Sequence, residues 1–115
     1  MSLGEPGADT LGIAEQDFLG SVAASDFPEH NFSVVQNDVG MSWVVIEPFV
    51  ARPGILRFTI CRVDPSVMVL IEDHGTNRRF CSAPDVEHAA TVIRNAADHA
   101  VLNAMNAHPA SAVLQ

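Results

Sequence analysis

Basic residues are scarce in this sequence: 6 Lys and Arg stand against 14 Asp and Glu, giving a formal net charge of -8. A surface with this balance repels the phosphates of nucleic acids and the head groups of anionic membranes. We therefore expect neither a nucleic acid nor a membrane as partner. A basic protein partner, or simple solubility, accounts better for the charge.

Cysteine is also rare, and the two cysteines, Cys61 and Cys81, are too few for a disulfide framework in 115 residues. Each is expected to act as a small apolar side chain. No apolar run approaches the length that spans a bilayer, and the N-terminus has neither the basic nor the apolar region of a secretion signal. These features predict a cytoplasmic protein.

Sequence motifs that carry chemistry are missing as well. The chain has no C-x-x-C pair, no G-x-S-x-G nucleophile turn and no glycine-rich phosphate loop. His88 and His99 fall on one side of a predicted helix, but about 16 Å apart, which is too far for joint metal ligation. We expect no catalytic residue, no metal and no cofactor.

The apolar share of 48% is ordinary for a globular protein, and 115 residues suffice for one core. We predict a flexible lead over 1–9, a single domain over 10–108 and a loose tail over 109–115. The clearest strand signal is Ile55–Gly75, where Asp64-Pro65-Ser66 separates two runs rich in Val, Ile and Thr, as in a hairpin.

Further strands are predicted over 32–36, 41–49 and 78–81, and helices over 10–24 and from Ser82 to about Met105. Asp9 or Thr10 would cap the first helix, Ser82 would cap the second, and Pro109 would follow its end. Such short connections imply antiparallel neighbours. The predicted fold is α+β: an N-terminal helix, a four- to five-stranded antiparallel meander, and a C-terminal helix, with both helices on one sheet face.

Side chains alternate between the two faces of a strand. One set per strand is wholly apolar, such as Leu56, Phe58 and Ile60, and is expected to lie beneath the helices. The opposite face then exposes a mixed set. Its apolar members include Trp43, Val45, Met68 and Leu70.

A contiguous apolar patch above a few hundred Å² usually marks a binding surface. We hypothesise a non-enzymatic interaction domain that pairs through this face with a second copy or with a protein partner, with Trp43 as the anchor. The competing interpretation is that the sheet curls around its second face, or that the face assignment is shifted by one residue.

A second hypothesis is a small-molecule-binding domain or enzyme with a pocket between sheet and helices. Arg57, Arg62, His74 and Arg78 would then line the mouth of that pocket. The segment Glu72-Asp73-His74 could do acid–base chemistry, although Asp, His and Gly are also ordinary residues of a solvated turn.

The acidity and the two terminal helices resemble bacterial type III secretion chaperones in composition and outline. That family normally inserts a helix between its strands, and this chain leaves no room for one. The resemblance therefore implies at most a related accessory role. An inhibitor or immunity protein whose acidic face mimics nucleic acid is a further hypothesis.

Overall fold

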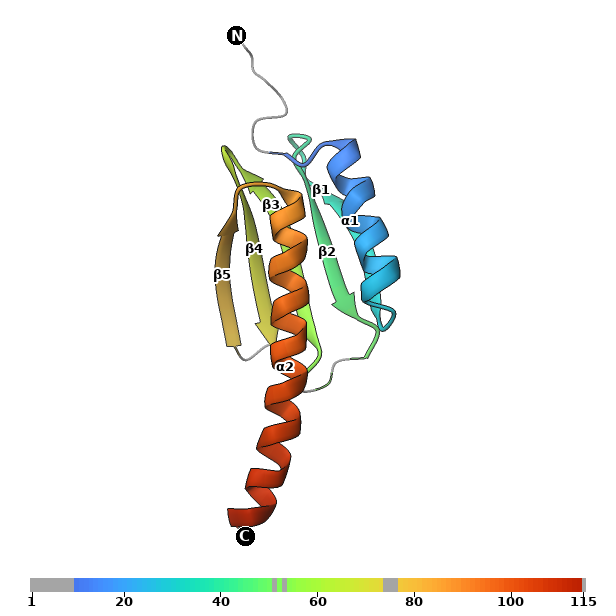
Figure 1. Cartoon of the computed structure of the whole chain (residues 1–115). Coiled ribbons are helices and arrows are strands. Elements are labelled where there is room, and N and C mark those ends of the chain that lie inside the picture. Colours follow the sequence, from blue (N-terminus) through green and yellow to red (C-terminus); the bar gives the residue numbers. More distant parts are fainter. Residues whose placement is uncertain (1–9, 51, 53, 74–76, 115) are drawn as a thin grey trace.

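A computed structural model of the chain describes residues 10–50, 52, 54–73 and 77–114. It contains two helices and five strands (Figure 1). In chain order these are α1 (Ile13–Asp26), β1 (His30–Gln36), β2 (Ser42–Pro48), β3 (Leu56–Val63), β4 (Ser66–Asp73), β5 (Asn77–Ala83) and α2 (Val86–Leu114).

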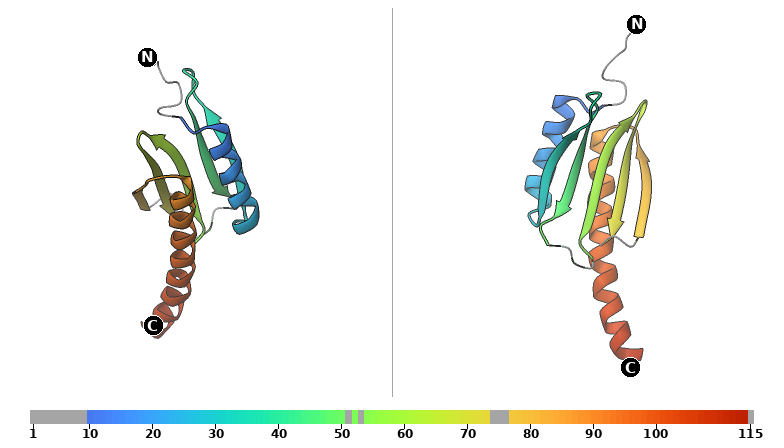
Figure 2. Two further views of the ribbon diagram at one scale, coloured as in Figure 1. Left: turned by 45° about the horizontal axis from the view of Figure 1, so that its top comes forward. Right: turned by 180° about the vertical axis from the view of Figure 1, so that it is seen from behind.

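The strands form one antiparallel sheet in the order β1-β2-β3-β4-β5, which confirms the predicted meander. Both helices pack on the same face, and Figure 2 shows the sheet from behind with no helix in front of it. Neither helix in the described part of the chain is both long and apolar enough to cross a membrane.

The core lies between the sheet and the two helices. Phe58 is fully buried in β3, and its ring centroid lies 5.5 Å from that of Phe27, which follows α1. From α2, Ala89, Ala90 and Ile93 pack into the same core. Small alanine side chains let α2 lie close to the strands, which is why an alanine-rich stripe faces them.

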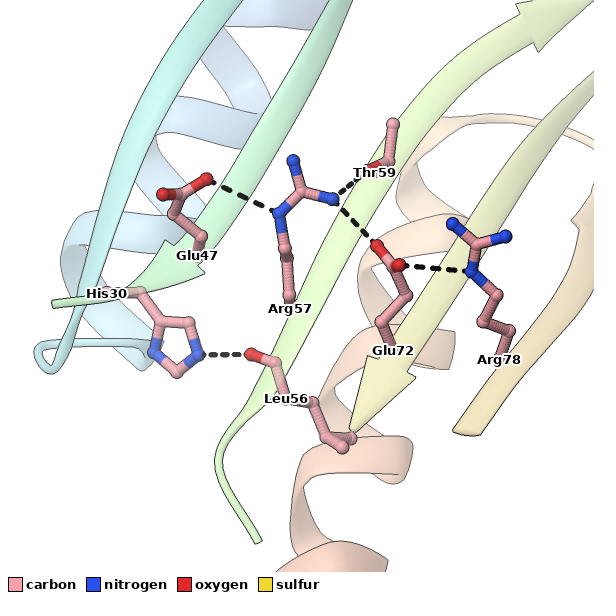
Figure 3. Close-up of polar contacts among 7 residues, drawn as sticks. All are labelled: His30, Glu47, Leu56, Arg57, Thr59, Glu72 and Arg78. Atoms are coloured by element: carbon pink, nitrogen blue, oxygen red, sulfur yellow. Dashed lines mark hydrogen bonds and ion pairs between the residues drawn. The ribbon is translucent and has the colours of Figure 1, made fainter. Parts of the chain in front are cut away.

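The sheet has a short seam between its two halves. In the register of β2 and β3, Val44–Ile46 pair with 58–60, and the strands then separate. His30 on β1 links the halves below this point, since its Nε2 donates to the carbonyl of Leu56, 2.7 Å away (Figure 3). A carbonyl oxygen can only accept, so the ring carries its proton on Nε2.

Charge is divided unequally between these halves. Residues 1–51 contain eight acidic residues and no Lys or Arg, whereas residues 52–115 contain six acidic residues and all six arginines. Among the residues that the structure describes, four ion pairs join the two segments: Glu15–Arg62, Asp26–Arg94, Glu29–Arg52 and Glu47–Arg57. Four of the six arginines are therefore engaged in ion pairs between the two segments, and the Glu15–Arg62 pair is the most shielded from water of these four.

The start of α1 differs from the prediction. The helix begins at Ile13 after Gly12, whose N–H donates to the Glu15 carboxylate at 2.9 Å. Thr10 does not cap this helix, because its hydroxyl accepts a hydrogen bond from the N–H of Ser42 at the start of β2. A contact between distant segments has replaced the expected local cap.

The prediction for the second helix was wrong at both ends. Ser82 belongs to β5, and Asp85 takes the capping role by accepting the N–H of His88 at 2.8 Å. Aspartate caps a helix as well as serine does. The helix also passes Pro109 and reaches Leu114. The proline removes one backbone hydrogen bond from the helix, but the alanines around it favour the helical conformation.

Candidate functional site

The sheet face turned away from α1 and α2 is called the bare face here (Figure 2, right). Directly opposed residues in an antiparallel sheet share a face. The register therefore aligns one row across all five strands on this side: Ser33, Val45, Thr59, Leu70 and Phe80. The neighbouring row holds Val35, Trp43, Cys61, Met68 and Ser82.

The four residues predicted to bind a partner, Trp43, Val45, Met68 and Leu70, all lie on the bare face. Phe58 lies in the core on the opposite, helix-covered face, so the sheet has two distinct faces as predicted. Trp43, Met68 and Leu70 are half-buried, whereas Val45 is only 5% exposed.

Phe80 extends this apolar surface and was not predicted. It is 67% exposed and lies opposite Leu70 in the register of β4 and β5. Alternation along β5 could have found it, since Phe80 is two residues from Arg78 and must share its face. Apolar side chains on the bare face therefore extend as far as the edge strand β5.

A row of alternating charge borders the apolar rows (Figure 3). Arg57 lies at its centre: its Nε donates to Oε1 of Glu47 at 3.3 Å, and its Nη1 donates to Oε1 of Glu72 at 2.7 Å. Arg78 completes the row by donating from Nε to Oε2 of Glu72 at 3.2 Å. Glu72 thus accepts from two arginines at once.

Burial and pairing act in opposite directions on these groups. Burial alone would raise the pKa of Glu72, whose side chain is 12% exposed, but the hydrogen bonds from Arg57 and Arg78 outweigh it and lower the pKa. Burial alone would lower the pKa of Arg57, and its bonds to Glu72 and Glu47 raise it instead. Both residues are held in their charged forms, which does not suit Glu72 to proton transfer at neutral pH.

Glu72→Gln should reduce the free energy of unfolding by about 2 kcal/mol at pH 7, because two hydrogen bonds to a charged carboxylate are weakened. The pKa of Glu72 is lower in the folded state, so its contribution is complete above the unfolded-state value and is lost as the pH falls through the folded-state value. Urea unfolding of both proteins from pH 7 down to pH 3 tests this. A difference between them that stays constant across the range contradicts it.

Of the four residues predicted to line a pocket, the structure describes three, and only Arg57 and Arg78 are brought together, at Glu72. Arg57 and Arg78 lie on the bare face. Arg62 pairs with Val67 of the core in the register, lies on the helix-covered side and binds Glu15. His74 lies outside the described residues. These arginines therefore do not converge on a space between sheet and helices.

The cysteines lie on opposite faces of the sheet. Cys61 is next to Met68 on the bare face, and burial raises the pKa of its thiol, which keeps it protonated and weakly nucleophilic. Cys81 packs against the core beneath α2. Within the described ranges, no group of three or more His, Cys, Asp or Glu side chains could hold a metal ion.

Comparison of the chain with protein-family models, with curated proteins and with solved structures finds no match.

Proposed function

We propose that this protein is a non-enzymatic interaction domain that pairs with a second copy of itself through the bare face. The observation that supports this is the group of apolar side chains Trp43, Met68, Leu70 and Phe80 on neighbouring rows of a sheet face that no helix covers. Large aromatic side chains dominate the energetics of protein interfaces, so Trp43 is the expected anchor.

Charge favours a second copy over a basic partner on this face. The bare face carries two glutamates and two arginines in one row, and they neutralise one another, although the whole chain has a net charge of -8. Two copies can approach here without bringing unpaired acids together. In a two-fold symmetric pair, Glu47 and Glu72 of one copy can face arginines of the other.

The size of the face sets the expected strength. Five strands spaced at about 4.8 Å and roughly seven residues long cover about 500 Å² of flat area per copy, or about 1,000 Å² in the pair. This is at the lower limit for a specific interface. We therefore expect reversible pairing with a dissociation constant on the order of micromolar.

Size-exclusion chromatography with light scattering tests the proposal on the wild-type chain. The mass should rise from the 12.3 kDa of one chain towards twice that value as the concentration increases. The transition should fall between about 1 and 100 μM. A mass that stays at one chain over that range contradicts the proposal.

A further inference from the structure

Arg79 differs from every other arginine of the chain. Arg52, Arg57, Arg62, Arg78 and Arg94 each hold a carboxylate, whereas Arg79 has no ion pair with any described residue. The chain has 14 acidic residues, and this guanidinium is still unpaired within the described part.

Arg79 and Arg78 project to opposite sides of the edge strand β5. Arg78 lies opposite Glu72 on the bare face, and Arg79 lies opposite Ile71 on the side of the helices. There Arg79 lines a solvent-open groove of about 490 Å³ between β5 and α2. Among the described residues, α2 lines the groove with Val92, Asn95, Ala96 and His99.

The lining residues have two kinds of chemistry. The guanidinium, the Asn95 carboxamide and the His99 ring supply hydrogen-bond donors, and a guanidinium binds a carboxylate through two parallel hydrogen bonds. Val92 and Ala96 add an apolar wall. The groove has one permanent positive charge within an acidic protein, which suits a singly charged anion better than a phosphate dianion.

We propose that this groove binds a carboxylate carried on a short apolar chain, with Arg79 binding the carboxylate and Val92 and Ala96 contacting the chain. The site is separate from the bare face and does not depend on self-association. The carboxylate can belong to a free short-chain acid or to the C-terminus of a peptide, because both present the same chemistry.

The test is a titration of isotope-labelled full-length protein with hexanoate, followed by NMR at Asn95, His99 and the Arg79 side chain. Saturable shifts are expected, with a dissociation constant on the order of 1 mM. Arg79→Gln should weaken binding by about tenfold or more, because charge-assisted hydrogen bonds are lost. Arg78→Gln is the matched control, one residue away on the other face. It should change the dissociation constant for hexanoate by less than about twofold.

Further arms of the titration separate the alternatives. Acetate should bind more weakly than hexanoate, and a dipeptide ending in leucine should bind only with a free, not an amidated, carboxyl group. The proposal is overturned if shifts do not saturate, if acetate matches hexanoate, or if Arg78→Gln weakens binding as much as Arg79→Gln. Arg79 would then serve only to discourage pairing at the edge of the sheet. Should Arg79→Gln fail to fold, Val92→Asp must abolish the hexanoate shifts instead.

Discussion

Leu70→Glu should leave the protein monomeric at concentrations at which the wild-type chain is paired. Leu70 lies within the bare face, between Thr59 and Phe80 in the register. A carboxylate there would lose its water on pairing, and Arg57 and Arg78 on the same face already bind Glu72. We expect the association constant to fall by about 100-fold or more, measured by sedimentation or light scattering.

A matched substitution elsewhere controls for the added charge. Ile13→Glu introduces the same side chain on α1, where the native residue is 71% exposed and away from the bare face. It should pair as the wild type does, and Trp43→Ala should weaken pairing without loss of the fold. If Leu70→Glu pairs as tightly as Ile13→Glu, the bare face is not the interface.

Phe58→Ala should cause a large loss of stability, about 4 kcal/mol in the free energy of unfolding. Phe58 is fully buried on the helix-covered face and packs against Phe27. Its removal opens a cavity that the surrounding strands cannot close. Trp43→Ala should cost well under half as much, because Trp43 is only half-buried on the opposite face.

Urea unfolding of the two variants at a concentration that keeps both monomeric makes the comparison. Phe58→Leu, which keeps most of the volume, should lose only about 1 kcal/mol and remains measurable if the alanine variant unfolds. Equal losses for Trp43→Ala and Phe58→Ala would mean that both side chains lie in one interior. That result contradicts the assignment of two faces.

Alternation along the strands made the sheet and its two faces predictable from the sequence. The hairpin of β3 and β4 has apolar residues at every second position and a turn at Asp64-Pro65, so strand identity and face follow locally. Trp43 and Leu70 fall on the bare face for the same reason. Such features need no knowledge of distant contacts.

Features set by distant residues could not be predicted in this way. Thr10 bonds to Ser42, 32 residues along the chain, and Arg62 bonds to Glu15, 47 residues away. Arg57, Arg62 and Arg78 were predicted to line the mouth of one pocket between sheet and helices, but alternation and register place Arg62 on the opposite face from the other two. The capping role of Asp85 was missed because Ser82 satisfies the same local pattern.

Trp43 is the one tryptophan of the chain, so its fluorescence reports directly on the bare face. If two copies pair through that face, dilution from about 100 μM to below 1 μM should shift the emission to longer wavelength as the indole meets water. The midpoint should coincide with the halving of the mass. An emission spectrum that stays unchanged while the mass halves would place the interface elsewhere and contradict self-association through the bare face.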